Sequence, residues 1–370
     1  MRTLKVLLYG DIYLNFMDGS TVWLISMAQM LTQNQNIKVD LLIKAPRKQK
    51  YLIEALDDIP NLHLIEPYAK KERYPFIPSN RLDVESAVKI MDQLNQENAY
   101  HLIIIRGQNL TLELSKISSL KEKTVPYITD FRHSENESTM EERKNLKFIY
   151  DEFQHIFLQT KETKGAFQKL LKVDGQKVVL LSPMVPNVEE TPQFQNKNNQ
   201  LVYAGKFHED WHTEEIIQAA INMEERQKEI NFLIIGDKFQ DRLREKENVI
   251  RIRKQWRKNI IFDKHGSDIA DWFKKICYLL STSDYEGSHV AVSEAMASGT
   301  VPIIRNWKGA ETIYPEEFIQ PTVEKMVEKI EQVVPTKDYR NGLKRFADHK
   351  FSKEEICEEI ETLIETLYKI

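Results

Sequence analysis

Residues 279–315 restrict the fold more than any other part of the chain. Residues 278–280 are apolar and predict a short buried strand, which a polar loop over residues 281–287 follows. The next residues, about 288–298, predict a compact helix, because a glycine suited to a left-handed helix end comes directly after them and a proline soon afterwards. Residues 301–304 predict a second strand. Together these elements form a βαβ unit, whose loop lies where open α/β sheets bind their ligands.

Two carboxylates lie in this unit, Glu286 in the loop and Glu294 in the helix. Their separation along the helix axis is roughly 9–12 Å, which suits two ends of one extended ligand better than a single acid/base pair. The backbone N–H groups of Gly287, Ser288 and His289 lie at the start of the helix and form a natural site for an anion. Two carboxylates that accept hydrogen bonds from hydroxyl groups, one on each side of an anion site, are typical of a binding site for a nucleotide-diphosphate sugar. The alternative is a helix-capping Glu286 and a solvated Glu294.

This stretch resembles the E-x7-E signature of retaining glycosyltransferases of the GT-B fold, the family-four group. Glu286 and Glu294 stand at the two glutamate positions of that signature, and Gly287 and the sequence Ala-Met-Ala after Glu294 match it as well. The resemblance implies that Glu286 faces the hydroxyls of the donor sugar and Glu294 the ribose. Many members continue Glu-Gly-Phe-Gly, whereas this chain has Ser288 and His289, which places an imidazole near the expected diphosphate.

The chain of 370 residues is too long for one ordinary core and suits two domains. We predict an α/β protein of two Rossmann-like domains that face each other across a cleft, as the resemblance implies. The predicted parts are an N-terminal acceptor-side domain, a polar linker, a C-terminal nucleotide-sugar-binding domain and a final amphipathic helix that packs toward the N-domain. Their ranges are 1–185, 186–200, 201–348 and 349–370. Further apolar runs predict strands at 4–9, 39–43, 62–65, 102–105, 125–129, 156–158, 178–181, 201–205 and 232–235.

Composition excludes several classes of protein. Hydrophobic residues make up 41% and charged residues 29% of the chain, and the formal net charge is −4, so no bulk basicity indicates nucleic-acid binding. No apolar run has the length of a membrane-spanning helix. The N-terminal residues predict a strand rather than a signal peptide. Two cysteines in apolar surroundings, Cys277 and Cys357, indicate packed thiols of a reducing compartment. We expect a cytoplasmic protein, with peripheral contact to the inner face of the membrane as an open alternative.

The start of the second half contains the expected diphosphate cation. A predicted strand ends with Gly205, and Lys206 follows it. The family has an arginine in place of Lys206 and a lysine five positions later, where this chain has Trp211. Lys206 supplies a point charge without the bidentate fork of arginine. We expect the second cation to be replaced by His208, His212 or His289, or by a group of the N-domain.

Three other segments are predicted to line the site because the resemblance places them there. Gly19 lies in the turn before the first helix, which we expect over residues 21–33 and whose counterpart in the family faces the donor phosphates and the acceptor. Asp130 and His133 follow a buried strand, where the family carries a histidine or aspartate near the reacting sugar. His265 lies in the loop that the family uses to bracket the nucleobase. For Gly19 a plain turn is an equally good reading.

Two basic segments stay open between a solvated surface and an anion-binding role. Residues 45–50 form a small cluster of positive charge, and residues 242–258 hold eight basic and two acidic residues around Trp256. An isolated short patch of this kind is more often a solvated face, and we expect no nucleic-acid partner. An anionic acceptor or a membrane surface is the functional alternative.

These observations predict a retaining hexosyltransferase of polysaccharide biosynthesis that moves a sugar from a nucleotide-diphosphate donor, a UDP-sugar, to a glycan, lipid-linked or cell-surface polymer acceptor. No cofactor is expected, and because the sequence contains no Asp-x-Asp motif we expect a metal-independent reaction. Two rivals stay open: another GT-B enzyme such as a sugar-nucleotide epimerase, and a non-catalytic GT-B subunit that binds glycan or stabilises a partner glycosyltransferase.

Overall fold

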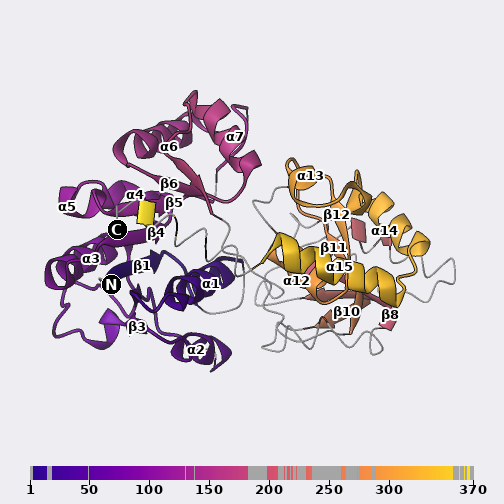
Figure 1. Ribbon diagram of the computed structural model, residues 1–370, viewed down its shortest axis with the longest axis horizontal. Coiled ribbons are helices and arrows are strands. Elements are labelled where there is room, and N and C mark those ends of the chain that lie inside the picture. Colours follow the sequence, from indigo (N-terminus) through magenta and orange to yellow (C-terminus); the bar gives the residue numbers. More distant parts are fainter. Residues whose placement is uncertain are drawn as a thin grey trace. The chain divides into compact units, whose positions relative to one another are not determined.

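The computed structural model describes residues 3–14, 19–48, 50–129, 131–136, 138–181, 198–206, 212, 215–216, 218–219, 222, 231–235, 260–263, 273, 275–284, 289–352, 358, 362 and 365–366. The chain forms two compact units. Unit 1 contains Met1–Met184 together with Lys353–Ile370, and unit 2 contains Val185–Ser352. Figure 1 labels the elements of both units. None of the helices in the described ranges has both the length and the apolar character needed to cross a membrane.

Unit 1 is built on a parallel sheet of seven strands in the order β3-β2-β1-β4-β5-β6-β7. The strands are β1 (Leu4–Gly10), β2 (Ile37–Leu42), β3 (Leu62–Ile65), β4 (Leu102–Arg106), β5 (Thr124–Tyr127), β6 (Ile156–Leu158) and β7 (Val178–Leu180). Strand β1 pairs in register with β4, Tyr9 opposite Ile105. Nearly all residues of β1 and β4 are buried on both faces, which is why they read as continuous apolar runs.

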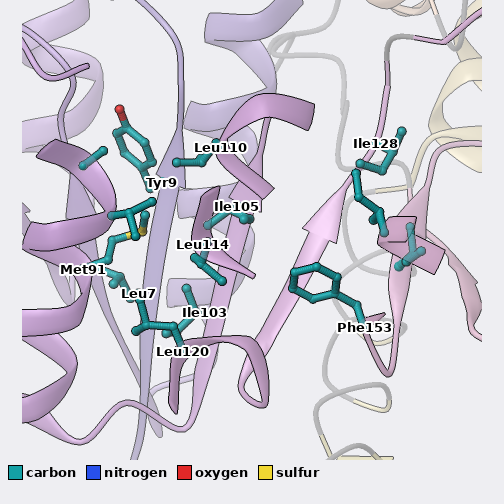
Figure 2. Packing of buried hydrophobic residues seen from close by; sticks show 14 of the residues in the cluster. Leu7, Tyr9, Met91, Ile103, Ile105, Leu110, Leu114, Leu120, Ile128 and Phe153 are labelled. Atoms are coloured by element: carbon teal, nitrogen blue, oxygen red, sulfur yellow. The ribbon is translucent and has the colours of Figure 1, made fainter. Parts of the chain in front are cut away.

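Helices cover both faces of this sheet. They are α1 (Gly19–Gln33), α2 (Lys50–Asp57), α3 (Val84–Asn98), α4 (Gln108–Leu114), α5 (Ser118–Lys121), α6 (Met140–Glu152) and α7 (Lys161–Leu171), with a 3-10 turn, η1 (Pro67–Ala69). On one face Leu7 and Ile103 of the strands pack with Met91 of α3 and Leu110 of α4, as Figure 2 shows. Side chains alternate along a strand, so the neighbouring residues of β1 meet the opposite layer, where α1 contacts β1 and β2.

Unit 2 repeats the same winding. Its six parallel strands follow the order β10-β9-β8-β11-β12-β13. The strands are β8 (Asn198–Lys206), β9 (Asn231–Ile235), β10 (Ile260–Asp263), β11 (Ile276–Ser281), β12 (Val301–Arg305) and β13 (Ile319–Gln320). The described helices are α12 (Val290–Ala297), α13 (Ala310–Ile313), α14 (Val323–Gln332) and α15 (Lys337–Lys350), with a 3-10 turn, η4 (Glu316–Phe318).

The core of unit 2 joins β11 and β12 with the helices α12, α13, α14 and α15. All six residues of β11 are buried, and Val292 and Met296 of α12 pack with them. Helix α15 lies against α12, and its buried Arg340 donates a hydrogen bond to the carbonyl of Gly299 at 3.0 Å. Gly299 directly follows Ser298, the C-cap residue of α12, so this contact links the turn after α12 to α15.

The predicted strands are all present within three residues of their expected bounds, and the helices show further differences. Strand β8 begins at Asn198, inside the range predicted as linker. Helix α1 begins at Gly19 rather than at residue 21, so this glycine is the first helical residue and not a turn residue. Helix α15 was not predicted, and the predicted final helix, residues 349–370, lies mostly outside the described residues. Gly299 has φ 68°, the left-handed conformation predicted for it.

Candidate functional site

The carboxyl ends of β8 and β11 meet at the point where the strand order of unit 2 reverses. Strands β9 and β10 lie on one side of this pair, and β12 and β13 on the other. Leu279 of β11 pairs with Tyr203 of β8, so the residues that follow both strands start side by side. Such a switch point is where doubly wound sheets bind ligands. Gly205 and Lys206 are the last two residues of β8 and reach this edge; only their backbone is described.

Glu294 stands in the second turn of α12, the helix that follows β11. Its side chain is half-buried and forms no hydrogen bond or ion pair with the described residues. Burial disfavours the ionised form of the carboxyl group and raises the pKa of Glu294 to about 7. Burying a carboxyl group without a partner is costly. This position therefore suits a carboxyl group that binds a ligand hydroxyl better than a carboxyl group of the solvated surface.

His289 is the N-cap residue of α12 and is only 8% exposed. Its Nδ1 lies 2.6 Å from Oγ of Ser281, the last residue of β11. The hydroxyl of Tyr314 donates to the carbonyl oxygen of His289 at 3.4 Å. The imidazole is thus fixed between the end of a strand and the start of a helix, beside the helix-start amides that favour anions.

A network of polar and charged side chains links three segments at this edge. Asp284 lies three residues beyond β11. Its Oδ1 accepts a hydrogen bond from Nε of Arg305 at 2.9 Å, and its Oδ2 lies 3.1 Å from Nε2 of His212. Nδ1 of His212 lies 2.8 Å from Glu215. Both ring nitrogens of His212 are therefore occupied by carboxylates. This arrangement does not support the idea that His212 replaces the missing cation by direct contact with a diphosphate.

Sequence reasoning did not identify Asp284 or Arg305 as site residues. Arg305 is the last residue of β12 and lies directly after an apolar run, and Asp284 lies in the polar loop after β11. Each of them is a polar residue at the carboxyl end of a predicted strand. That position alone would have made them candidates.

The corresponding edge of unit 1 holds His133. Its ring packs against Phe131 with the centroids 5.0 Å apart, in the segment that follows β5. Nearby, Arg106 at the end of β4 donates to Oγ1 of Thr129 at 3.2 Å. Lys44 forms an ion pair of 2.6 Å with Asp11, which follows β1. The expected acceptor-side residue thus lies at the carboxyl edge of its own sheet.

Not every predicted position is settled by these contacts. Gly19 is exposed, and nothing lies within 4 Å of the point where a Cβ would be. Six predicted residues lie outside the described residues: Glu286, Gly287, Ser288, Asp130, His208 and His265. Within the described ranges, no group of three or more His, Cys, Asp or Glu side chains is arranged to hold a metal ion.

Comparison with known proteins agrees with this architecture. Residues 198–335 match the family model described as glycosyl transferases group 1. Comparison with curated proteins gives no significant match. Among solved structures, that of TarM is 12% identical, covers 98% of both chains and superposes with a TM-score of 0.75. Anabaena HepE in complex with UDP and glucose is 14% identical, covers 98% of this chain and 100% of that one, and has a TM-score of 0.71.

The pneumococcal O-GlcNAc transferase GtfA, in complex with UDP and GlcNAc, is 11% identical with a TM-score of 0.71, and the match covers 98% of this chain and 99% of that one. These structures extend over the whole chain, so the likeness concerns both units and not only the range of the family model. At such low identity they establish the fold. The chain therefore has the GT-B fold, and its residues 198–335 match the family model of group 1 glycosyl transferases.

Proposed function

We propose that the protein is a retaining glycosyltransferase that moves a sugar from a nucleotide-diphosphate donor, a UDP-sugar, to a glycan or lipid-linked acceptor. The observation that carries the proposal is Glu294, a half-buried carboxyl group without a partner among the described residues, beside the switch point of a group 1 domain. The complexes of HepE and GtfA with UDP support the choice of uridine.

The roles of the donor-side residues follow from their chemistry. The carboxylate of Glu294 accepts hydrogen bonds from the ribose hydroxyls, and Glu286 accepts them from the sugar. Lys206, at the end of β8, and His289, at the start of α12, face the diphosphate with the helix-start amides. Together they stabilise the negative charge that develops on the departing diphosphate.

The reaction needs little covalent chemistry from the protein. The bond between the anomeric carbon and the diphosphate oxygen breaks, and a bond to the acceptor oxygen forms on the same face of the sugar. The proton of the acceptor hydroxyl passes to the leaving phosphate. Positioning and electrostatic stabilisation then supply most of the rate enhancement. His133 and Asp130 of unit 1 orient the reacting hydroxyls. The reaction is proposed to run without a metal ion, because the sequence lacks an Asp-x-Asp motif.

The second candidate is a non-catalytic subunit of this fold that binds glycan or stabilises a partner enzyme. One observation favours it: Trp211 stands where the family carries the second diphosphate cation. The unpartnered Glu294 speaks against it, because a subunit without a nucleotide site has no need of a half-buried free carboxyl group.

Nucleotide binding decides between these candidates. UDP, GDP and ADP are titrated calorimetrically into the purified protein in the presence of a chelator, and then into Glu294→Ala. We expect UDP to bind, and the variant to bind it at least tenfold more weakly. Glu331→Ala, which removes an exposed carboxylate of α14, is the matched control and keeps the affinity. A folded protein that binds none of the three nucleotides contradicts the proposal and supports the non-catalytic role.

A further inference from the structure

The network of polar and charged side chains at the carboxyl edge of unit 2 has no assigned role. It consists of His212, Asp284 and Arg305, which follow or end three different strands, β8, β11 and β12. We call these three residues the edge triad. Asp284 is its middle member and uses a different carboxylate oxygen for each neighbour, Oδ1 for Arg305 and Oδ2 for His212. A carboxylate held by both oxygens from two directions has a fixed orientation.

Burial shows which members of the edge triad are anchored. The side chains of His212 and Arg305 are 17% and 23% exposed, whereas that of Asp284 is 48% exposed. His212 and Arg305 are thus mostly buried in unit 2, and the carboxylate of Asp284 between them lies at the surface of that unit. Ion pairs of this exposure contribute only about 0–1 kcal/mol to stability. Stability alone is a poor reason for the arrangement.

The backbone at His212 gives a second indication that this edge is held in place. His212 has φ 53°, the left-handed conformation that residues with a Cβ rarely adopt. Its carbonyl oxygen accepts a hydrogen bond from the amide of Ile216 at 3.1 Å, and Ile216 is fully buried. A strained conformation persists only where its surroundings enforce it. Its ring is fixed between Glu215 and Asp284, each bonded to one nitrogen.

We propose that Asp284 is a positioning residue for the donor site. It holds residues 282–284, the described residues after β11, by binding Arg305 at the end of β12 and His212 after β8. Glu286, the first glutamate of the E-x7-E motif, follows Asp284 by two residues in the sequence. This inference rests on the proposed function, because the donor is what the positioned segment would bind. Asp284 itself touches no reacting atom in this scheme.

The test compares Asp284→Asn with a matched control. Asp284→Asn keeps the shape of the side chain and removes its charge. Asp348→Asn makes the same substitution in an exposed ion pair of α15, with Lys344 at 2.9 Å, away from the sheet edge. Hydrogen exchange measured by mass spectrometry on the full chain reports the three segments without any ligand. We expect faster exchange in Asp284→Asn after β11 and also after β8 and β12, and no such change in Asp348→Asn.

The second readout is the donor. UDP is titrated into both variants, and KM and kcat for UDP-glucose hydrolysis are measured. We expect Asp284→Asn to raise the Kd of UDP and the donor KM about tenfold, with kcat changed less than threefold. The double variant Asp284→Asn/Arg305→Gln is expected to bind UDP no more weakly than Asp284→Asn, because the first substitution already removes the contact between Asp284 and Arg305.

Each outcome has a definite meaning. Unchanged exchange after β8 and β12, or an unchanged Kd for UDP, overturns the positioning role. An additive loss in the double variant also overturns it, because Asp284 and Arg305 then act separately. If the unsubstituted protein binds no nucleotide while the exchange of the three segments stays coupled, the proposed function fails. The edge triad is then a structural link only, and the positioning role is rejected with it.

Discussion

Replacing Glu294 by glutamine is expected to change how the stability of the protein depends on pH. Glutamine keeps the shape of the side chain and removes its charge. In the folded chain burial raises the pKa of Glu294 from 4.5 to about 7, because the ionised form is poorly solvated there. The unfolded chain loses the same proton near the ordinary value. The folded state therefore binds more protons than the unfolded state between about pH 4.5 and 7, and stability falls as the pH rises through this window.

The magnitude follows from the same values. Each pKa unit corresponds to about 1.4 kcal/mol, so the rise from 4.5 to about 7 amounts to roughly 3 kcal/mol, or 2–3 kcal/mol because the group is only half-buried. Below pH 4.5 the carboxyl group is protonated in both states and this contribution to stability is fully present. Above pH 7 it is lost. Glu294→Gln has no such group, so its stability relative to the unsubstituted protein grows across the window.

Urea unfolding followed by circular dichroism at pH 5, 6, 7 and 8 measures the effect. The free energy of unfolding of Glu294→Gln minus that of the unsubstituted protein is expected to rise by 2–3 kcal/mol between pH 5 and 8. Glu331→Gln, in exposed sequence of the same unit, controls for the loss of any carboxylate. A difference that stays constant with pH refutes the argument. The same ionisation predicts tighter UDP binding as the pH rises through 7, since only the carboxylate accepts from both ribose hydroxyls.

Two further predictions concern the fold. Gly175→Ala is expected to destabilise the protein by about 1–2 kcal/mol, because Gly175 has φ 71° and an added Cβ would lie 2.6 Å from Nε2 of Gln168. Gly342→Ala, in the middle of α15 with nothing within 4 Å of its Cβ position, is expected to stabilise the protein by about 0.5–1 kcal/mol. Urea unfolding of both variants measures the two effects, and equal effects would contradict the prediction. Arg340→Met is expected to cost about 2 kcal/mol, because the carbonyl of Gly299 loses a buried donor; thermal unfolding measures this, and an unchanged Tm would show that the contact does not fix α12.

The sheets could be predicted because their strands are buried on both faces. The run at 102–105 has no polar interruption, and β4 occupies Leu102–Arg106 with its first four residues buried. Short edge elements gave no comparable signal: β13 has only the two residues Ile319–Gln320, half-exposed. Helix α15 was not predicted, because few of its residues are apolar and its burial depends on Arg340, a residue that sequence patterns assign to the surface.

The site shows the same division between local and tertiary information. Glu294 could be selected as a candidate site residue because its spacing from Glu286 belongs to one continuous motif, and its ligand-binding role stays a prediction. The edge triad could not, since it joins residues 212, 284 and 305, which become neighbours only when three strands align at one edge. The contact of His289 with Ser281 could not be predicted for the same reason, because Ser281 lies at the end of β11 and no spacing pattern in the sequence indicates that the two side chains meet.

The grouping of residues 353–370 with unit 1 has a consequence for the synthesis of the protein. Unit 2 is an insertion within unit 1, so the ribosome makes the whole seven-stranded sheet early but supplies the remaining part of that unit only after residue 352. A domain ordinarily folds as soon as its own residues have emerged. Here the last residues of the first unit are made only after the second unit has been translated, and a fragment that ends near residue 184 lacks them altogether. Expression of the first unit alone would therefore require residues 353–370 to be joined to it.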